Sequence, residues 1–342
     1  MKSPRVILAV LMLVLIPALA GGEDREPKGT FGLFVDNDLF AFSDGGYTNG
    51  VDLVWLSPAL GESGGRVPLW LNRLSRRIGT GRWPGSLRFV SFSLSQRMYT
   101  PEDITRHDLV REDRPYAGVL TAALGLHFRH GDAMESLRLE AGIVGPHSFA
   151  GDFQKILHRA FGWTFPEGWE HQLRDEPVLG LGFDHRWKIR ASSSVSSLDW
   201  ELIGHGGGDM SNLFTALGGG FEIRAGWNLP SDLGTSLVGP ASDAAALLVD
   251  PAPPPAGVDH LGFHVFASVD VHEVYRDLLL DGNTFRSSHR VSKMPLIADL
   301  ATGFALRYKR FKACLSYTYQ TRRFEGEKLK PLLGSIDLAL LF

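Results

Sequence analysis

Hydrophobic and polar residues alternate with a period of two in many segments of this chain. In the segment 311–320 the odd positions are mainly apolar or aromatic, and the even positions are small or polar. Because successive side chains of a β-strand point to opposite faces, such a segment predicts a strand with one apolar and one more polar face. Twelve strands are expected in all, at residues 30–37, 47–57, 86–98, 116–128, 135–145, 177–190, 197–207, 213–228, 261–274, 295–308, 311–324 and 334–342.

Charged residues on the second face of so many strands need water or other charges around them. A soluble β-sandwich places that face outside, whereas an outer-membrane barrel places it in the lumen. The last strand, 334–342, carries its apolar residues on one parity and ends on the aromatic Phe342, which resembles the closing strand of a bacterial outer-membrane barrel. The pattern therefore favours an all-β fold, a twelve-stranded antiparallel transmembrane β-barrel.

The N-terminal residues predict export. Lys2 and Arg5 precede an apolar run at 6–16 that is followed by small residues ending at Ala20. A basic start, a short apolar core and an A-x-A-like end are typical of a secretory signal peptide. A membrane-spanning helix needs about 20 apolar residues, so this run is too short to be one. We expect residues 1–20 to be a cleaved signal peptide and residues 21–342 to form a barrel in the cell outer membrane.

Composition narrows the classes of function. The chain has 39 glycines, 11% aromatic residues and a net charge of −3, so nothing in its charge points to a nucleic-acid partner. Cys314 is the single cysteine, which excludes a disulfide within the chain and a zinc site built from several thiolates.

Strand parity assigns the connecting segments to the two sides of the membrane. Segments 38–46, 99–115 and 146–176 are expected outside the cell, and the short links 129–134 and 191–196 in the periplasm. The periplasmic segments 58–85 and 229–260 exceed the usual length of such turns. The second contains a proline run at 251–255 and is expected to be an extended, mobile excursion.

Two external segments concentrate polar chemistry. Residues 35–50 gather carboxylate, amide and hydroxyl side chains around a Gly pair, which suits either a hard cation such as calcium or an Asx-rich turn. Residues 151–162 have the apolar spacing of a short helix, with Asp152 expected to cap its start. His158 on that helix is either a packed residue or a general base beside a metal.

Several motifs taken together resemble the outer-membrane lipid A 3′-O-deacylase family. They are Asn37-Asp38, Tyr47-Thr48-Asn49-Gly50, Asp113-Arg114-Pro115-Tyr116-Ala117-Gly118, Gly145-Pro146, His158-Arg159 and Gly168-Trp169-Glu170-His171-Gln172. The match covers nearly the whole mature chain. The resemblance implies a twelve-stranded barrel that removes the 3′-linked acyloxyacyl group of lipid A with calcium (Ca2+), at a site between the barrel wall and an extracellular helix.

The resemblance also implies roles for single residues. Asn37, Thr48 and His158 match catalytic positions of the family, with His158 activating water, and Asp38 matches the calcium site. In metal-assisted ester hydrolysis the cation polarises the carbonyl and stabilises the oxyanion while His takes a proton from water. The sequence departs from the family at Thr164, where the enterobacterial member has a Glu six residues after its His. Glu167 and Glu170 are the candidates to replace it.

Two other functions stay open at this point. A passive pore or structural barrel explains the alternation but gives no reason for a His on a loop helix. A different membrane hydrolase is the third, although no Gly-x-Ser-x-Gly elbow supports a serine nucleophile. The partners expected are lipopolysaccharide and outer-membrane lipids, with no nucleic acid and no obligate protein partner.

Overall fold

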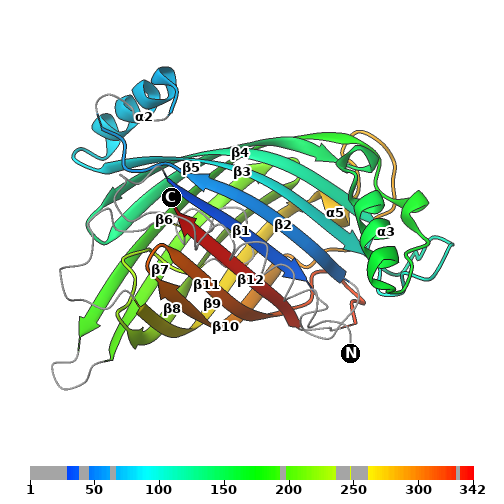
Figure 1. Cartoon of the computed structure of the whole chain (residues 1–342). Helices are drawn as coiled ribbons and strands as arrows, with labels where there is room; N and C mark the ends of the chain where they lie inside the picture. The colour runs from blue at the N-terminus through cyan, green and yellow to red at the C-terminus, as the bar shows by residue number, and fades with distance from the viewer. Residues whose placement is uncertain are drawn as a thin grey trace.

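Twelve β-strands make up most of the molecule (Figure 1). The computed structural model describes residues 29–37, 46–61, 67–192, 198–235, 247, 261–328 and 332–342. The strands are β1 (Thr30–Asn37), β2 (Gly46–Leu56), β3 (Leu87–Thr100), β4 (Ala117–His130), β5 (Ala133–Val144), β6 (Glu176–Ser192), β7 (Asp199–Ser211), β8 (Phe214–Trp227), β9 (Leu261–Asp277), β10 (Leu296–Tyr308), β11 (Phe311–Gln320) and β12 (Leu332–Leu341). Each predicted strand is present. The proposed signal peptide lies outside the described residues and stays a prediction.

Every strand pairs antiparallel with its sequence neighbours, and β1 pairs with β12 to close the barrel. The closing register joins Thr30 to Leu341 and Asn37 to Gly334, so the whole of β1 lies against the last strand. Closure leaves no strand edge with unpaired backbone groups, which a sheet in lipid requires. The predicted twelve-stranded antiparallel barrel is confirmed.

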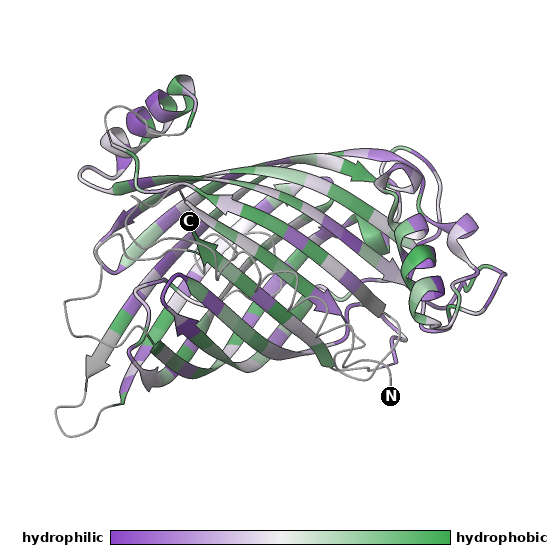
Figure 2. Ribbon diagram, in the orientation of Figure 1, coloured by the Kyte–Doolittle hydropathy of each residue, from purple (hydrophilic) through white to green (hydrophobic). Residues whose placement is uncertain are grey.

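The two faces of the wall differ as the alternation predicts. Apolar side chains such as Leu181, Ile223 and Phe304 are exposed on the outside. Charged side chains such as Glu201 and Arg224 on neighbouring strands are buried in the lumen. Figure 2 shows apolar and polar residues alternating along the ribbons of the wall. An outer surface of this kind fits a bilayer and not water.

The two ends of the barrel are unlike. At the end where β1 begins and β12 ends, called the near end, residues 131–132 and 309–310 form two-residue hairpins. Gly131 and Lys309 take positive φ values of 59° and 52° there, as tight hairpin turns require. The opposite, far end carries the longer connections 101–116 and 145–175. Outer-membrane barrels keep short turns in the periplasm and longer loops outside, so the near end is the periplasmic one.

The connection after β8 turns into the lumen. Asp232 and Leu233 are buried, and the carboxylate of Asp232 accepts hydrogen bonds from Arg224 Nη1 and Lys312 Nζ, both at 2.6 Å. Burial alone would raise the pKa of Asp232, but the positive charges of Arg224, Lys312 and Lys188 outweigh it and hold the pKa below its usual range. The expectation of an extended, mobile excursion is thus wrong for residues 229–235. The proline run lies outside the described residues.

Among the described residues, helices occur only in the connections between strands. They are α2 (Leu69–Arg82), η2 (Pro146–Ser148), α3 (Ala150–Phe161), η3 (Trp169–His171) and α5 (Leu278–Asp281). None of the helices in this part of the chain is both long and apolar enough to span a bilayer. The helix α3 confirms the predicted loop helix, whereas α2 fills the long segment 58–85 for which no helix was predicted.

The start of α3 differs from the prediction. The N-cap position is Phe149, with φ of 60°, and no side chain caps the helix. Asp152 lies inside the first turn, so its predicted capping role is wrong, although a carboxylate there still interacts favourably with the helix dipole. The helix starts earlier because η2 ends directly before it and fixes the backbone at Phe149.

Candidate active site on the outer wall

The helix α3 is held against the outer wall by a close approach of backbones. Gly145, with φ of 111°, donates its N–H to the carbonyl of Gly118 on β4 at 2.9 Å. A side chain at Gly118 would collide with Ser148 and Ala150, which lie directly over it. Gln96 of β3 adds a hydrogen bond from Nε2 to the carbonyl of Ser148 at 2.7 Å. The Gly145-Pro146 and Ala117-Gly118 motifs therefore allow this helix to pack closely against the wall.

An aromatic pair also packs against α3. The buried rings of Tyr116 and Trp169 lie 5.1 Å apart, and Gly151 of α3 packs on the Trp169 ring. Burial raises the pKa of Tyr116 to about 12, so its hydroxyl stays protonated near neutral pH. Trp169 Nε1 donates to Oε1 of Gln154 on α3 at 2.6 Å. The Gln154 side chain is also buried, and its Nε2 has no hydrogen-bond partner among the described residues.

His158 lies one turn after Gln154 and is 4% exposed. Its Nδ1 is hydrogen-bonded to the backbone carbonyl of Thr164, and its ring meets Trp163 edge-on at 5.4 Å. A carbonyl oxygen only accepts, so Nδ1 carries the proton and Nε2 of the neutral ring is left as the acceptor. Gly162, with φ of 66°, ends the helix and turns the chain back so that Thr164 reaches the His. The arrangement suits a general base.

The two other histidines of this region are placed differently. His147 Nδ1 lies 2.6 Å from Asp175, and the His147 side chain is 73% exposed. At the surface, His171 Nε2 donates to the backbone carbonyl of His107 at 3.0 Å and lies 3.4 Å from Oε1 of Glu170. Both are surface residues with acidic partners, so His158 is the buried histidine of the loop helix.

The wall beside this helix carries two asparagines on its outer face. Asn37 follows the parity of the outward-facing Phe31, and Asn49 follows the parity of the outward-facing Leu53. The two asparagines are register partners across β1 and β2. They are only 9% and 7% exposed although the outer face of these strands is otherwise open. No described donor reaches the buried Oδ1 of Asn49.

Register links these asparagines to the helix. Asn49 is opposite Met98 of β3, and Met98 packs in one buried cluster with Ala150, Tyr116 and Trp169. Figure 1 shows α3 at the far end of the barrel, and its contacts are with β3 and β4. Predicted residues Asn37 and His158 thus belong to one region of the outer wall.

Two polar residues of this site were not predicted from the sequence. Asn49 could have been found, because an amide on the apolar parity of a strand is costly in lipid and calls for a polar neighbour. Gln154 could have been found by its position one helical turn before His158, on the same face of the helix.

Two predicted site residues cannot be placed in the same way. Asp38 and the side chain of Thr48 lie outside the described residues, so their roles stay predictions. The pairing of β2 with β3 shifts register between Tyr47 and Asn49, which is a bulge at Thr48. Bulges are frequent next to active sites, where they redirect a side chain.

The fit of a calcium ion can be tested only in part. Within the described ranges, no three His, Cys, Asp or Glu side chains converge on a metal position. Glu170, one candidate to replace the family's Glu, is instead engaged with His107 at 3.2 Å. The unpartnered Oδ1 of Asn49 is the kind of neutral oxygen ligand that calcium accepts. Asn49 thus offers one oxygen ligand among the described residues of this region, and calcium with Asp38 as its carboxylate stays a prediction.

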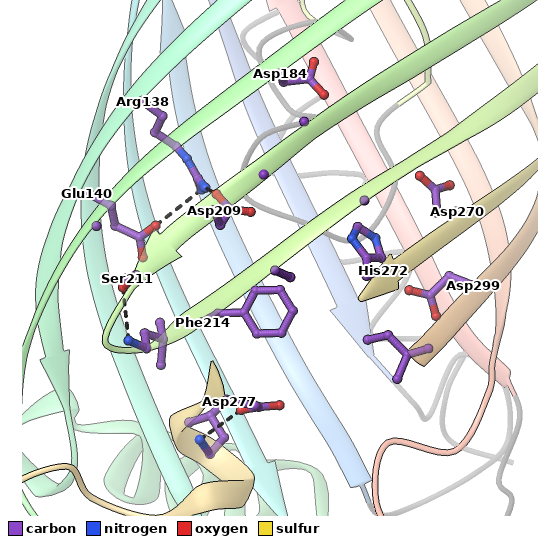
Figure 3. A pocket seen from close by; sticks show the side chains of 18 of the residues that line it. Arg138, Glu140, Asp184, Asp209, Ser211, Phe214, Asp270, His272, Asp277 and Asp299 are labelled. Carbon is purple, nitrogen blue, oxygen red and sulfur yellow. Dashed lines mark hydrogen bonds and ion pairs between the residues drawn. The ribbon is translucent and has the colours of Figure 1, made fainter. Parts of the chain in front are cut away.

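The lumen contains a cavity of about 290 Å³ that is lined by charged side chains among others. Figure 3 shows side chains from several strands around it, including Arg138, Glu140, Asp270 and Asp299. These charges are balanced by ion pairs: Arg138 with Asp209 and Glu140, His205 with Asp270 at 2.6 Å, and Arg323 with Asp299. Charges that neutralise one another across the lumen have a structural explanation, so the outer-wall site is the stronger candidate.

The fold and this site define an integral outer-membrane β-barrel whose polar site lies on its outer wall. The chain belongs to the LpxR family, because the model "Outer membrane protein LpxR" matches residues 6–342. This is the lipid A 3′-O-deacylase family that the sequence motifs resemble, so that prediction and the outer-membrane location are confirmed.

A solved structure of the family shares the fold. The structure of LpxR from Salmonella typhimurium matches with a TM-score of 0.73 and 17% identity, over 92% of this chain and 100% of that chain. The beta domain of the Bordetella autotransporter Brka has a TM-score of 0.42 and 10% identity, over 93% of this chain and 100% of that one. A search of curated protein sequences finds no match.

Proposed function

We propose that this protein hydrolyses the ester of the 3′-linked acyloxyacyl group of lipid A, with calcium as its cofactor. The observation that carries the proposal is the buried His158, whose Nδ1 is hydrogen-bonded to Thr164 and whose Nε2 is left as an acceptor beside a polar patch on a lipid-facing wall. Lipid A reaches such a site by lateral diffusion in the outer leaflet. A site on the wall is therefore suited to an acylated lipid and not to a soluble substrate.

His158 has the role of general base in this proposal. Its Nε2 takes a proton from water, and the hydroxide attacks the ester carbonyl; the bond to the sugar oxygen then breaks, and that oxygen receives the proton as the acid is released. The Thr164 carbonyl stabilises the imidazolium that forms, because Nδ1–H is already directed at it. The backbone carbonyl thus orients the ring of His158, as an acidic side chain does in other histidine bases.

The asparagines and Asp38 form the polar side of the site. Asn37 and Asn49 present amide groups from adjacent strands, and Asp38 follows Asn37 directly in the chain. Calcium held by Asp38 and amide oxygens such as Asn49 Oδ1 would polarise the ester carbonyl and stabilise the oxyanion. Thr48, at the bulge, is the remaining candidate from the sequence for binding the substrate.

An inserted segment occupies the near end of the lumen, which argues against the alternative of a passive pore. Leu233 and Leu247 are buried together with Phe34 and Met134 at the near end. The ion pairs of Asp232 with Arg224 and Lys312 tie the inserted segment to the wall. A solute would have to displace these contacts to pass.

Mass spectrometry of lipid A tests the proposal directly. Outer membranes that contain the protein should yield lipid A that has lost one acyloxyacyl group, and membranes without it should not. Chelation with EGTA should stop the reaction, added calcium should restore it, and Asp38→Ala should stay inactive at modest calcium. Magnesium should substitute poorly, because it demands a tighter octahedral shell.

The outcomes separate the parts of the proposal. Unchanged lipid A with correctly folded protein would refute the deacylase activity. Full activity in excess chelator would remove calcium from the mechanism while leaving the hydrolysis in place, and the oxyanion would then need protein donors such as Asn37.

A further inference from the structure

The helix α2 lies on the outside of the barrel at the near end, far from the proposed active site (Figure 1). It connects β2 to β3, where a barrel needs only a short turn. The extra residues 57–86 are therefore not explained by closure of the barrel.

A tight seat fixes one face of α2 to the wall. Leu71 is fully buried in a cluster with Val90 of β3 and Phe128 of β4. Trp83 stacks on the Phe128 ring at 4.8 Å, and a side chain at Gly79 would meet the same ring at 3.0 Å. The helix is thus packed on the outward side of β3 and β4.

Arg88 of β3 adds a polar clamp to this seat. Its Nη1 donates to the Asn72 carbonyl at 3.3 Å, to Asn72 Oδ1 at 3.0 Å and to Ser75 Oγ at 3.2 Å. Its Nη2 donates to the carbonyls of Leu60 and Gly61 at 3.2 and 3.4 Å. With both guanidinium ends engaged, α2 and the chain leading into it keep one orientation relative to the barrel.

The remaining surface of α2 divides into an apolar stripe and a basic face. Trp70 and Leu74 are 61% and 41% exposed, and with Ile78 they form a stripe at a spacing of four residues. Arg73, Arg76 and Arg77 are exposed next to this stripe, and the exposed Leu69 lies one turn before Arg73. The sequence of α2 contains no Asp or Glu, and none of these three arginines forms an ion pair within the part of the chain that the structure describes.

We propose that α2 is an interfacial helix that binds the anionic phospholipid surface of the periplasmic leaflet. Its position supports this occupant, because α2 continues the apolar outer wall at the end where that wall leaves the membrane. Its chemistry supports it too: a helix with Trp and Leu on one side and arginines on the other lies in the headgroup region, with the cations on phosphate. The proposal does not depend on the activity at the far end.

Depth measurements on the full-length protein in nanodiscs test this placement. In a Cys314→Ala background, an environment-sensitive fluorophore is attached to Leu74→Cys in the apolar stripe, or to Thr80→Cys on the basic side as the matched control. Leu181→Cys on the lipid-facing wall and Phe285→Cys in an exposed loop mark the two extremes. Quenching by nitroxide-labelled lipid and by a water-soluble quencher is compared in discs of phosphatidylcholine alone and with phosphatidylglycerol. Heat-modifiable migration on gels checks that each variant is folded.

The proposal predicts that labels on the two sides of α2 are quenched differently. With phosphatidylglycerol, the label at position 74 should be quenched by the lipid nitroxide as at position 181, and the label at 80 by the aqueous quencher. Replacing Arg73, Arg76 and Arg77 by Gln should raise the aqueous quenching rate at position 74 by about tenfold. A label at 74 as accessible as that at 285 in both discs would overturn the proposal and point to a protein or a second copy as the occupant. Equal depth in both discs, indifferent to the arginines, would overturn the anionic partner.

Discussion

The helices α3 and α2 lie on the same two strands of the outer wall but at opposite ends. They differ in the side chains that they present to the wall. The wall-facing side of α3 carries Gln154 and His158, polar groups of which Gln154 Nε2 has no partner among the described residues. The wall-facing side of α2 is apolar or fully hydrogen-bonded through Arg88. A buried polar group without a hydrogen-bond partner in the described part of the fold is available to bind a substrate. This difference supports the proposed chemistry at α3 and the proposed membrane attachment at α2.

The largest effect is expected at the base. His158→Gln keeps a similar shape but removes the group that takes the proton, so the rate of deacylation should fall by about 10²–10⁴. Lipid A mass spectrometry over a time course measures it, with heat-modifiable migration as the check on folding. His147→Gln and His171→Gln are the matched controls and should stay within about twofold of the parent. A His158→Gln enzyme as active as these controls would place the chemistry elsewhere.

A smaller effect is expected one turn earlier on α3. Gln154→Met keeps the volume but leaves the buried Trp169 Nε1 without its acceptor, a change that costs about 1–3 kcal/mol. Because this loosens the seat of His158, activity should fall by about tenfold, and the temperature at which the folded gel band disappears should drop. Asp152→Asn, on the exposed side of the same helix, should leave activity unchanged and lower that temperature less, because it removes only a favourable interaction with the helix dipole. If Gln154→Met matched it, the polar seat would have no part in holding His158.

The smallest effect on activity is expected from the clamp of α2. Arg88→Met keeps the aliphatic stem and removes the hydrogen bonds to Asn72, Ser75, Leu60 and Gly61. Trypsin should then cleave at the arginines of α2 about tenfold faster, since release of the helix is no longer opposed by these bonds, while deacylation stays within about twofold. Arg129→Met on β4 is the control. Equal cleavage of the two variants would show that the apolar seat alone fixes α2.

The barrel was predictable because each strand repeats one simple rule. Outward residues meet lipid and inward residues meet water or charge, so alternation locates a strand such as β10 or β11 within a few residues. The start of α3 was less predictable. It depends on the preceding turn through Gly145 and Phe149, a contact between segments that periodicity does not report.

The candidate site was also predictable only in part from the sequence. His158 was predicted as a site residue because it lies on an expected external helix and matches a family motif. The structure adds what the sequence could not, namely its burial and its hydrogen bond to the carbonyl of Thr164. The helix α2 was not predicted, although Trp70, Leu74 and Ile78 have helical spacing. Its two glycines lower the helix propensity of the segment, and its arginines lower its apolar character. Its stability comes from the wall and not from its own sequence.

The strands between the two helices also set a length. β3 and β4 have 14 residues each, which at about 3.3 Å per residue and a tilt of about 45° span roughly 33 Å along the membrane normal. The helix α3 lies near one end of this span, and α2, which is proposed to bind the periplasmic headgroups, lies near the other. The distance between the two helices therefore sets the bilayer thickness that this side of the barrel matches. A membrane thinner or thicker than this spacing must deform around β3 and β4 or tilt the barrel, and either response shifts the ester bonds of the outer leaflet relative to His158.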